Sequence, residues 1–182
     1  MPTQEEKIYW YAVRTFYCKE ESVAKHLKEN GVEYFIPSIY KEDILPSGKK
    51  TRKLVPAIHN LLFIKKTKDE EDIKKVIESW PTMVSVIQNK STHSYYNIPD
   101  SQMTELRAIC DPNYENTIYV DSTFAEARKG DRVTITRGTF KGLEGKLTRY
   151  KGRSYVIITI ANLGVMLHIP KWYCKKIEEP TE

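Results

Sequence analysis

The chain has 182 residues, of which 40% are hydrophobic and 29% charged, and its formal net charge is +5. No apolar run approaches the ~20 residues that cross a bilayer, and the start MPTQEEKIYW lacks the apolar core of a signal peptide. We therefore expect no membrane segment and a cytoplasmic location. The three cysteines are an odd number without a CxxC pair, which argues against both a disulfide framework and a zinc site.

The charge is distributed unevenly along the chain. Residues 1–127 hold 17 Lys and Arg against 19 Asp and Glu, a net of −2, whereas residues 128–182 hold 12 against 5, a net of +7. Such a step predicts two units with different partners. A mildly basic soluble domain at the C-terminal end is the simpler alternative.

Strand and helix patterns alternate along the first part of the chain. The aromatic and β-branched run 8–16 predicts a strand, and the segment EESVAKHLKEN that follows carries Val23 and Leu27 on one helical face before Gly31. Two strands then flank a turn at residues 46–49, which predicts a hairpin with a basic far side.

A short buried strand, NLLFIKK, follows the hairpin. After it come a helix with Ile73 and Trp80 on its apolar stripe, a strand MVSVIQ, and a helix that Asp100 caps. This order predicts an antiparallel sheet with helices packed on one face, in an α+β domain of residues 1–110. The second face of the sheet would be solvated or used for binding.

The pattern changes after residue 110. Residues 111–127 show no sustained period and predict a linker, in which Ile118, Tyr119 and Val120 are able to dock locally. Residues 128–182 contain short strands bounded by glycine or polar turns, which is typical of a small closed barrel. The β-branched run SYVIITI and the interspersed glycines favour this barrel over a helical hairpin.

The stretch TRGTFKGLEGKL (136–147) raises the question of a phosphate-binding loop. A P-loop needs Ser or Thr after GK and a helix behind it, but here Leu147 follows Gly145-Lys146 and the pattern continues as a strand. The glycines instead permit tight turns and close backbone approach. This stretch therefore predicts a turn between strands.

GDRVTITRGTFKGLEGKLTRY resembles a KOW motif, in which the middle glycine, here Gly142, follows a hydrophobic and a basic residue. WYAVRTF (10–16) and AIHNLLFI (57–64) resemble the first strand and the Phe-Pro-x-Tyr-hydrophobic-Phe-Val segment of the NusG N-terminal domain. The resemblance covers residues 8–177 apart from the linker. It implies a NusG-type domain followed by an SH3-like KOW barrel, in a factor that binds RNA polymerase and suppresses pausing or termination.

Carried over residue by residue, the resemblance implies that apolar side chains contact the clamp coiled coil of RNA polymerase. The candidates are Phe16, Ile58, Leu61 and Phe63, although a core position explains Phe63 equally well. The motif's proline is His59 here, and aliphatic Ile58 and Leu61 replace its aromatic residues. These departures resemble the specialised antiterminators of the RfaH and UpxY type, which act at specific operons such as surface polysaccharide loci.

Two groups of basic residues are candidate contacts for non-template DNA or nascent RNA. Resemblance to the specialised paralogues implies a patch at Lys25 and His26, on the exposed side of the first helix, where solvation alone is the simpler explanation. Clustered cations also bind phosphate whatever the base sequence, or protect a strand edge from aggregation. The hairpin supplies such a cluster in Lys49, Lys50, Arg52 and Lys53.

The partner implied for the KOW domain is a small-subunit ribosomal protein or a termination factor. Phe140, Leu163 and Gly164 are the candidate contacts, because the family has an apolar partner-binding residue beside a glycine, and we expect Leu163 to be exposed at a turn. The rival interpretation is a ribosome-associated KOW protein that binds RNA through residues 128–182.

An enzyme is not expected from this sequence. The HExxH and GxSxG motifs are absent and the four histidines are scattered. Cys18 and His26 are candidates for a catalytic pair of nucleophile and base, but the sequence marks no third group that would orient them. We therefore expect a monomeric binding protein without catalytic residues, cofactor or metal.

Overall fold

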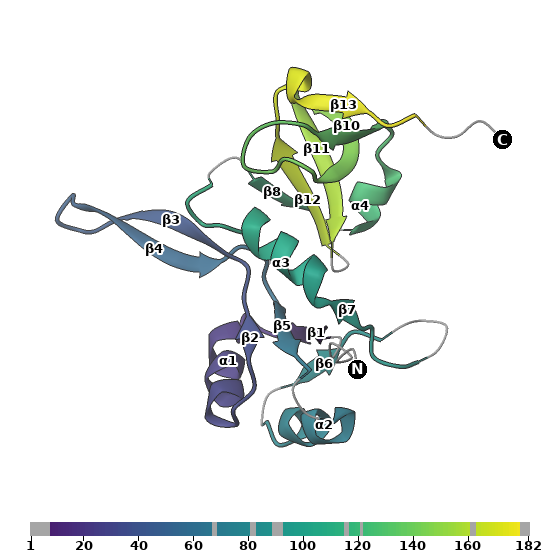
Figure 1. Cartoon of the computed structure of the whole chain (residues 1–182). Helices are drawn as coiled ribbons and strands as arrows, with labels where there is room; N and C mark the ends of the chain where they lie inside the picture. The colour runs from purple at the N-terminus through teal and green to yellow at the C-terminus, as the bar shows by residue number, and fades with distance from the viewer. Residues whose placement is uncertain are drawn as a thin grey trace, which may run out of the picture. The chain divides into compact units, whose positions relative to one another are not determined.

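A computed structural model describes residues 8–66, 69–80, 83–88, 93–114, 117–120, 122–160 and 163–178. The chain forms two compact units, Met1–Thr104 and Glu105–Glu182 (Figure 1). Each unit is described by itself below. In the described part of the chain, no helix is both long and apolar enough to cross a membrane.

The N-terminal unit is built on an antiparallel sheet with the strand order β2-β5-β1-β6, and β7 also pairs with β1. This arrangement agrees with the mixed sheet-and-helix fold expected from the sequence. The strands are β1 (Tyr9–Thr15), β2 (Tyr34–Phe35), β5 (Leu61–Lys65), β6 (Val84–Val86) and β7 (Ile98–Pro99). The helices are α1 (Glu20–Glu29), α2 (Glu70–Glu78) and α3 (Asp100–Ile109), and the boundary between the units falls within α3.

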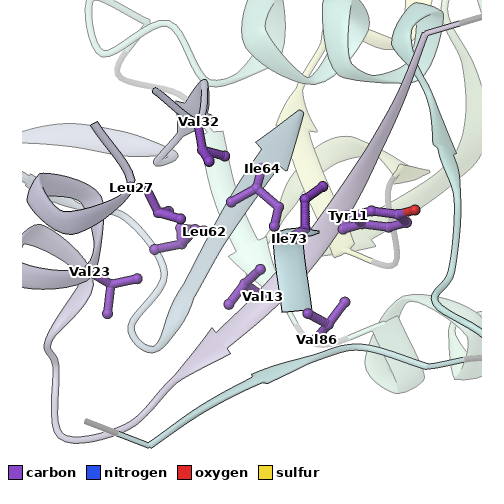
Figure 2. Close-up of a cluster of buried hydrophobic side chains, with 9 residues drawn as sticks. All are labelled: Tyr11, Val13, Val23, Leu27, Val32, Leu62, Ile64, Ile73 and Val86. Carbon is purple, nitrogen blue, oxygen red and sulfur yellow. The ribbon is translucent and has the colours of Figure 1, made fainter. Parts of the chain in front are cut away.

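One face of this sheet forms the main core of the unit, and Figure 2 shows its side chains. Alternate residues of the central strands point to this face, as the two-residue repeat of a strand requires. Apolar residues of α1 and α2 meet them there. The buried members are Tyr11, Val13, Val23, Leu27, Val32, Leu62, Ile64, Ile73 and Val86.

The second face of the sheet is also buried at its centre. The register pairs Ala12 with Phe63, which places both side chains on this face, and the ring of Phe35 stacks on Phe63 with centroids 6.4 Å apart. Trp10 is fully buried and its indole N–H donates to Asp100 Oδ1 at 2.7 Å. The sheet therefore does not leave its second face open to solvent along the middle of β1 and β5.

The predicted hairpin is confirmed. Strands β3 (Ser38–Ile44) and β4 (Lys50–Pro56) pair with each other as a separate two-stranded sheet, which extends from the rest of the unit (Figure 1). Leu45 N–H donates to Lys49 O at 3.0 Å, and Gly48 takes a φ of 78° that suits glycine in the turn. Both faces of this hairpin are largely exposed.

The C-terminal unit contains a six-stranded antiparallel sheet with the order β13-β9-β10-β11-β12-β8. Its strands are β8 (Thr117–Val120), β9 (Asp131–Ile135), β10 (Glu144–Tyr150), β11 (Arg153–Ile160), β12 (Leu163–His168) and β13 (Cys174–Lys176). Between them lie the short helix α4 (Ser122–Ala127) and the 3₁₀ turn η1 (Lys171–Tyr173). The β-branched segment SYVIITI lies in β11, as its composition predicts.

The expected linker contains regular structure. Tyr119 of β8 pairs with Val165 of β12, so the sheet gains an edge strand from a segment without clear periodicity. Ala125 of α4 is buried against Tyr155, Ile157 and Met166. Residues that follow Asp111 therefore belong in part to the C-terminal fold.

The glycine-rich stretch forms the turn between β9 and β10, as predicted. Gly142 has a φ of 96°, and its N–H donates to Ile135 O at 2.7 Å. Gly145 serves a different purpose, because a Cβ at this position would overlap the carbonyl oxygen of Ile157 and the side chain of Val156. One glycine thus permits the turn, and the other permits close approach of β10 to β11.

We expect Gly145→Ala to destabilise the C-terminal sheet by about 1–3 kcal/mol, because the added methyl group has no space against β11. Hydrogen exchange of the β10 and β11 amides in the full-length protein measures this change. Glu144→Ala is the matched control, since its ion pair with Arg132 (3.6 Å) joins two exposed side chains and contributes little. Equal protection in the two variants would contradict the packing role of Gly145.

Candidate functional site

The four polymerase-contact candidates divide into two pairs. Phe16 and Ile58 are half-buried and lie in the loops that follow β1 and precede β5. Leu61 and Phe63 are only 8% and 0% exposed. Both side chains point to the second face of the sheet, where the ring of Phe35 stacks on Phe63.

Asn60 ties together the two loops that carry Phe16 and Ile58. Its backbone oxygen accepts from Thr15 N–H at 3.1 Å, its side-chain oxygen accepts from Cys18 N–H at 2.9 Å, and its own N–H donates to Glu20 Oε1. We call residues 16–20 and 57–60, which these bonds connect, the loop junction. It fixes Phe16 and Ile58 at one end of the central strand pair.

Tyr17 is an exposed aromatic residue of the loop junction that sequence analysis missed. Its side chain is 82% exposed and its φ is 59°, a left-handed conformation in which the chain turns away from the line of β1. The strand pattern gave no sign of this turn. Tyr17 therefore adds an exposed aromatic side chain next to Phe16.

The β3–β4 hairpin combines exposed apolar and basic side chains. The register pairs Tyr40 with Leu54 and Ile44 with Lys50, so these four side chains share one face. Ile44 is 66% exposed, and the guanidinium of Arg52 lies 5.2 Å from the centre of the Tyr40 ring. The apolar members were not among the candidates, because the sequence pattern does not show that both faces of the hairpin are largely exposed.

All four basic candidates on the hairpin are solvent-accessible. Lys49, Lys50, Arg52 and Lys53 are accessible in the turn and in β4, while Glu42 and Asp43 lie on β3. With Lys41, the segment 38–56 carries five cations and two anions. The hairpin is therefore a positively charged projection.

Lys25 and His26 do not form a common patch. Lys25 is exposed, but His26 is half-buried between α1 and α2, which corrects the expectation that both lie on the exposed side. His26 Nε2 lies 3.1 Å from Val76 O, and its ring centre lies 4.5 Å from that of Trp80. The position of α2, which sequence analysis could not supply, explains the difference.

We expect His26→Ala to lower the free energy of unfolding by about 1–2 kcal/mol, because a hydrogen bond and a ring contact between the helices are lost. Lys25→Ala is the adjacent control and should change it by less than about 0.5 kcal/mol. Urea unfolding of the full-length variants measures both. A stable His26→Ala variant with reduced DNA affinity would contradict this structural role.

The candidates in the C-terminal unit are largely buried. Phe140 is 3% exposed and its ring meets Tyr114 edge-on, with centroids 4.6 Å apart. Leu163 is buried opposite Ile160, and Gly164 pairs with Thr159, so the expectation of an exposed Leu163 is wrong. Leu163 is the first residue of β12, and because β12 pairs with β11, its side chain is buried in the core.

Trp172 is a large exposed apolar residue of this unit that sequence analysis missed. It lies in η1 and its side chain is 77% exposed. The signal available in the sequence is the position of Trp172 two residues after Pro170, a residue type that favours a turn.

Cys18, Glu20 and His59 form a cluster at the loop junction. Cys18 Sγ lies 3.7 Å from His59 Nδ1, which lies 4.0 Å from Glu20 Oε1. Among the described residues, these three have the types and the spacing that a metal ion requires. The imagined partner of Cys18, His26, instead contacts α2.

These features define the class of protein by its architecture: two units, of which the first is an α+β sheet unit with a loop junction and a basic hairpin, and the second is rich in strands. A comparison with protein families matches residues 8–107 to the NusG family, described as transcription termination factor nusG. This match covers more than half of the chain and contains both the loop junction and the hairpin. The protein belongs to the NusG family. A search among curated proteins found no match.

Proposed function

We propose that this protein is a transcription elongation factor that binds RNA polymerase through its N-terminal unit and suppresses pausing or termination. The family match over residues 8–107 is the observation that carries this proposal. A binding role also suits the exposed aromatic and basic side chains of the loop junction and the hairpin.

The proposed polymerase contact is the apolar part of the loop junction. Phe16, Tyr17 and Ile58 offer apolar surface to a helical partner such as the clamp coiled coil. Leu61 and Phe63 continue this segment into β5. Because they are buried, their participation requires the chain that covers them to move.

The hairpin is the proposed nucleic-acid contact. Its cations provide affinity for phosphate that does not depend on base sequence, and exposed Tyr40 offers a ring on which an unpaired base can stack. Non-template DNA and nascent RNA are the two ligands that this chemistry suits within a transcribing complex.

The C-terminal unit is proposed to be an SH3-like KOW barrel that recruits a second partner, a small-subunit ribosomal protein or a termination factor. Phe140, Leu163 and Gly164 lie in its sheet and turns, and Trp172 is its exposed apolar anchor. The second candidate function is RNA binding by residues 128–182, which their net charge of +7 favours.

A specialised role in antitermination at particular operons, such as surface polysaccharide loci, is the finer form of the proposal. The test maps the positions on the genome at which the tagged full-length protein is found together with RNA polymerase. Occupancy at one or a few loci supports the specialised role, uniform occupancy supports a general elongation factor, and recovery with ribosomes but not polymerase contradicts both.

We expect Ile58→Asp to weaken binding of purified RNA polymerase by at least about tenfold, because it places a charge in a desolvated contact. Ile44→Asp on the hairpin is the matched control, since it removes an exposed isoleucine outside the loop junction. Binding is measured by biolayer interferometry with full-length variants whose circular dichroism is unchanged. If both variants lost polymerase affinity equally, the contact could not be assigned to the loop junction.

We expect the double variant Lys50→Gln and Arg52→Gln to bind duplex DNA more weakly and with a shallower salt dependence, by about 1–2 in the slope of log K against log salt. Fluorescence anisotropy between low and moderate salt measures this slope. Lys74→Gln with Lys75→Gln is the matched control on exposed α2. An unchanged slope in the hairpin variant would show that the hairpin does not touch phosphate.

A further inference from the structure

The loop junction brings three potential ligand atoms to one point. Cys18 Sγ lies in the loop after β1, the Glu20 carboxylate at the start of α1 and His59 Nδ1 in the loop before β5, and all three ligand atoms lie within 4.8 Å of one another. From this convergence we propose that Cys18, Glu20 and His59 form a zinc site, with a fourth position open to water or to an external ligand. This inference does not depend on the proposed function.

Two of the three separations lie close to those of a tetrahedral zinc site, and the third, between Cys18 Sγ and a Glu20 carboxylate oxygen, is at most 4.8 Å. Zinc bonds of about 2.3 Å to sulfur and about 2.0 Å to nitrogen place the two atoms about 3.6 Å apart, and the Cys18–His59 separation is 3.7 Å. Oxygen and nitrogen ligands lie about 3.4 Å apart in such a site, and the observed His59–Glu20 separation is 4.0 Å. Zinc binding would therefore bring the Glu20 carboxylate about 0.6 Å closer to His59 Nδ1, from 4.0 Å to about 3.4 Å. A thiolate, an imidazole and a carboxylate are all ordinary zinc ligands, whereas calcium and magnesium prefer oxygen alone.

The same residue types could instead form a catalytic relay, but the geometry does not suit one. A nucleophile–base–carboxylate relay uses both ring nitrogens, one toward the thiol and the other toward the carboxylate. Here the thiol and the carboxylate both approach Nδ1 of His59. Three ligand atoms that all lie near one another fit a single metal ion between them better than a chain of proton transfers.

Glu20 supplies an independent indication of a cation. Glu20 is the first residue of α1 and is only 2% exposed. Among the described residues, its carboxylate accepts one hydrogen bond, from Asn60 N–H. The N-terminus of α1 favours a negative charge there, but a buried carboxylate normally has more partners. A zinc ion would neutralise this charge and complete its coordination.

The other cysteines are poor competitors for the metal. Burial raises the pKa of Cys110 to about 11, although a hydrogen bond with Tyr119 acts in the opposite direction. Burial also raises the pKa of Cys174. A metal must displace the thiol proton, so the exposed Cys18 is the cysteine whose position favours binding.

A bound ion would fasten the loop after β1 to the loop before β5. Three hydrogen bonds through Asn60 already connect them, and three metal–ligand bonds would add a stronger connection at the exposed side of the same junction. The loops that bear Phe16 and Ile58 would then be held in fixed relation to each other.

The test uses the metal-free, reduced full-length protein, titrated with Co²⁺ as a spectroscopic probe and with Zn²⁺ against a chromophoric chelator. We expect one equivalent of either ion to bind and Co²⁺ to give a thiolate charge-transfer band. Cys18→Ser should abolish that band, and His59→Gln should weaken zinc binding by at least about tenfold, because one of three protein ligands is lost. The exposed side chain of His59 makes that variant compatible with folding.

Matched controls lie outside the cluster. Cys174→Ser and His93→Gln remove a cysteine and an exposed histidine, and both should keep the charge-transfer band and the affinity of the parent protein. Glu20→Gln keeps an oxygen that accepts from Asn60 but removes the charge, and its zinc binding should also weaken. Absence of saturable one-to-one binding by the parent protein would overturn the proposal. Retention of the band in Cys18→Ser, or its loss in Cys174→Ser, would do the same.

Discussion

The antiparallel pairing of β1 with β5 is the constraint on which the N-terminal unit depends. Its register sets Val13 beside Leu62 on the face covered by α1 and α2, and Ala12 beside Phe63 on the opposite face. Burial of each large side chain contributes about 2 kcal/mol. A slip of one residue would exchange the two faces of β5 relative to β1, and would take Leu62 away from α1 and α2 and Phe63 away from Phe35. Phe63 is fully buried on the second face and stacks with Phe35, so it is a core residue although it lies in the segment that resembles a binding motif.

The loop junction follows directly from this register. Where β1 ends, Thr15 donates to the backbone oxygen of Asn60, and Asn60 takes a left-handed conformation with φ of 63°. Asparagine tolerates this conformation better than most residues. It presents its N–H to Glu20 and its side chain to Cys18 N–H. The exposed aromatic residue, the proposed polymerase contact and the proposed metal ligands therefore share one support, which is the rigid end of the central strand pair.

The sequence predicts what depends on local patterns and misses what depends on distant partners. The helices near residues 20–29 and 70–78, the hairpin and the glycine turn all follow from periodicity and turn chemistry. Burial of His26 by α2 and of Leu163 by β11 depends on neighbours that no local pattern names. Strand β8 pairs with β12 although residues 111–127 lack a sustained period. The cluster at the loop junction was missed for the same reason, because Cys18 and His59 meet only after β1 and β5 have paired.

Family membership and the chemistry of the loop junction are separate properties of this chain. The family match covers the sheet, the helices and the hairpin of the N-terminal unit. The segment AIHNLLFI, however, has His59 where the motif it resembles has proline, and a proline side chain has no atom that can bind a metal. Histidine at this position adds a nitrogen within reach of Cys18 and Glu20, while Asn60 keeps the backbone geometry of the turn. Histidine at this position therefore gives the turn beside the proposed polymerase contact one of the three proposed metal ligands, which proline would not supply.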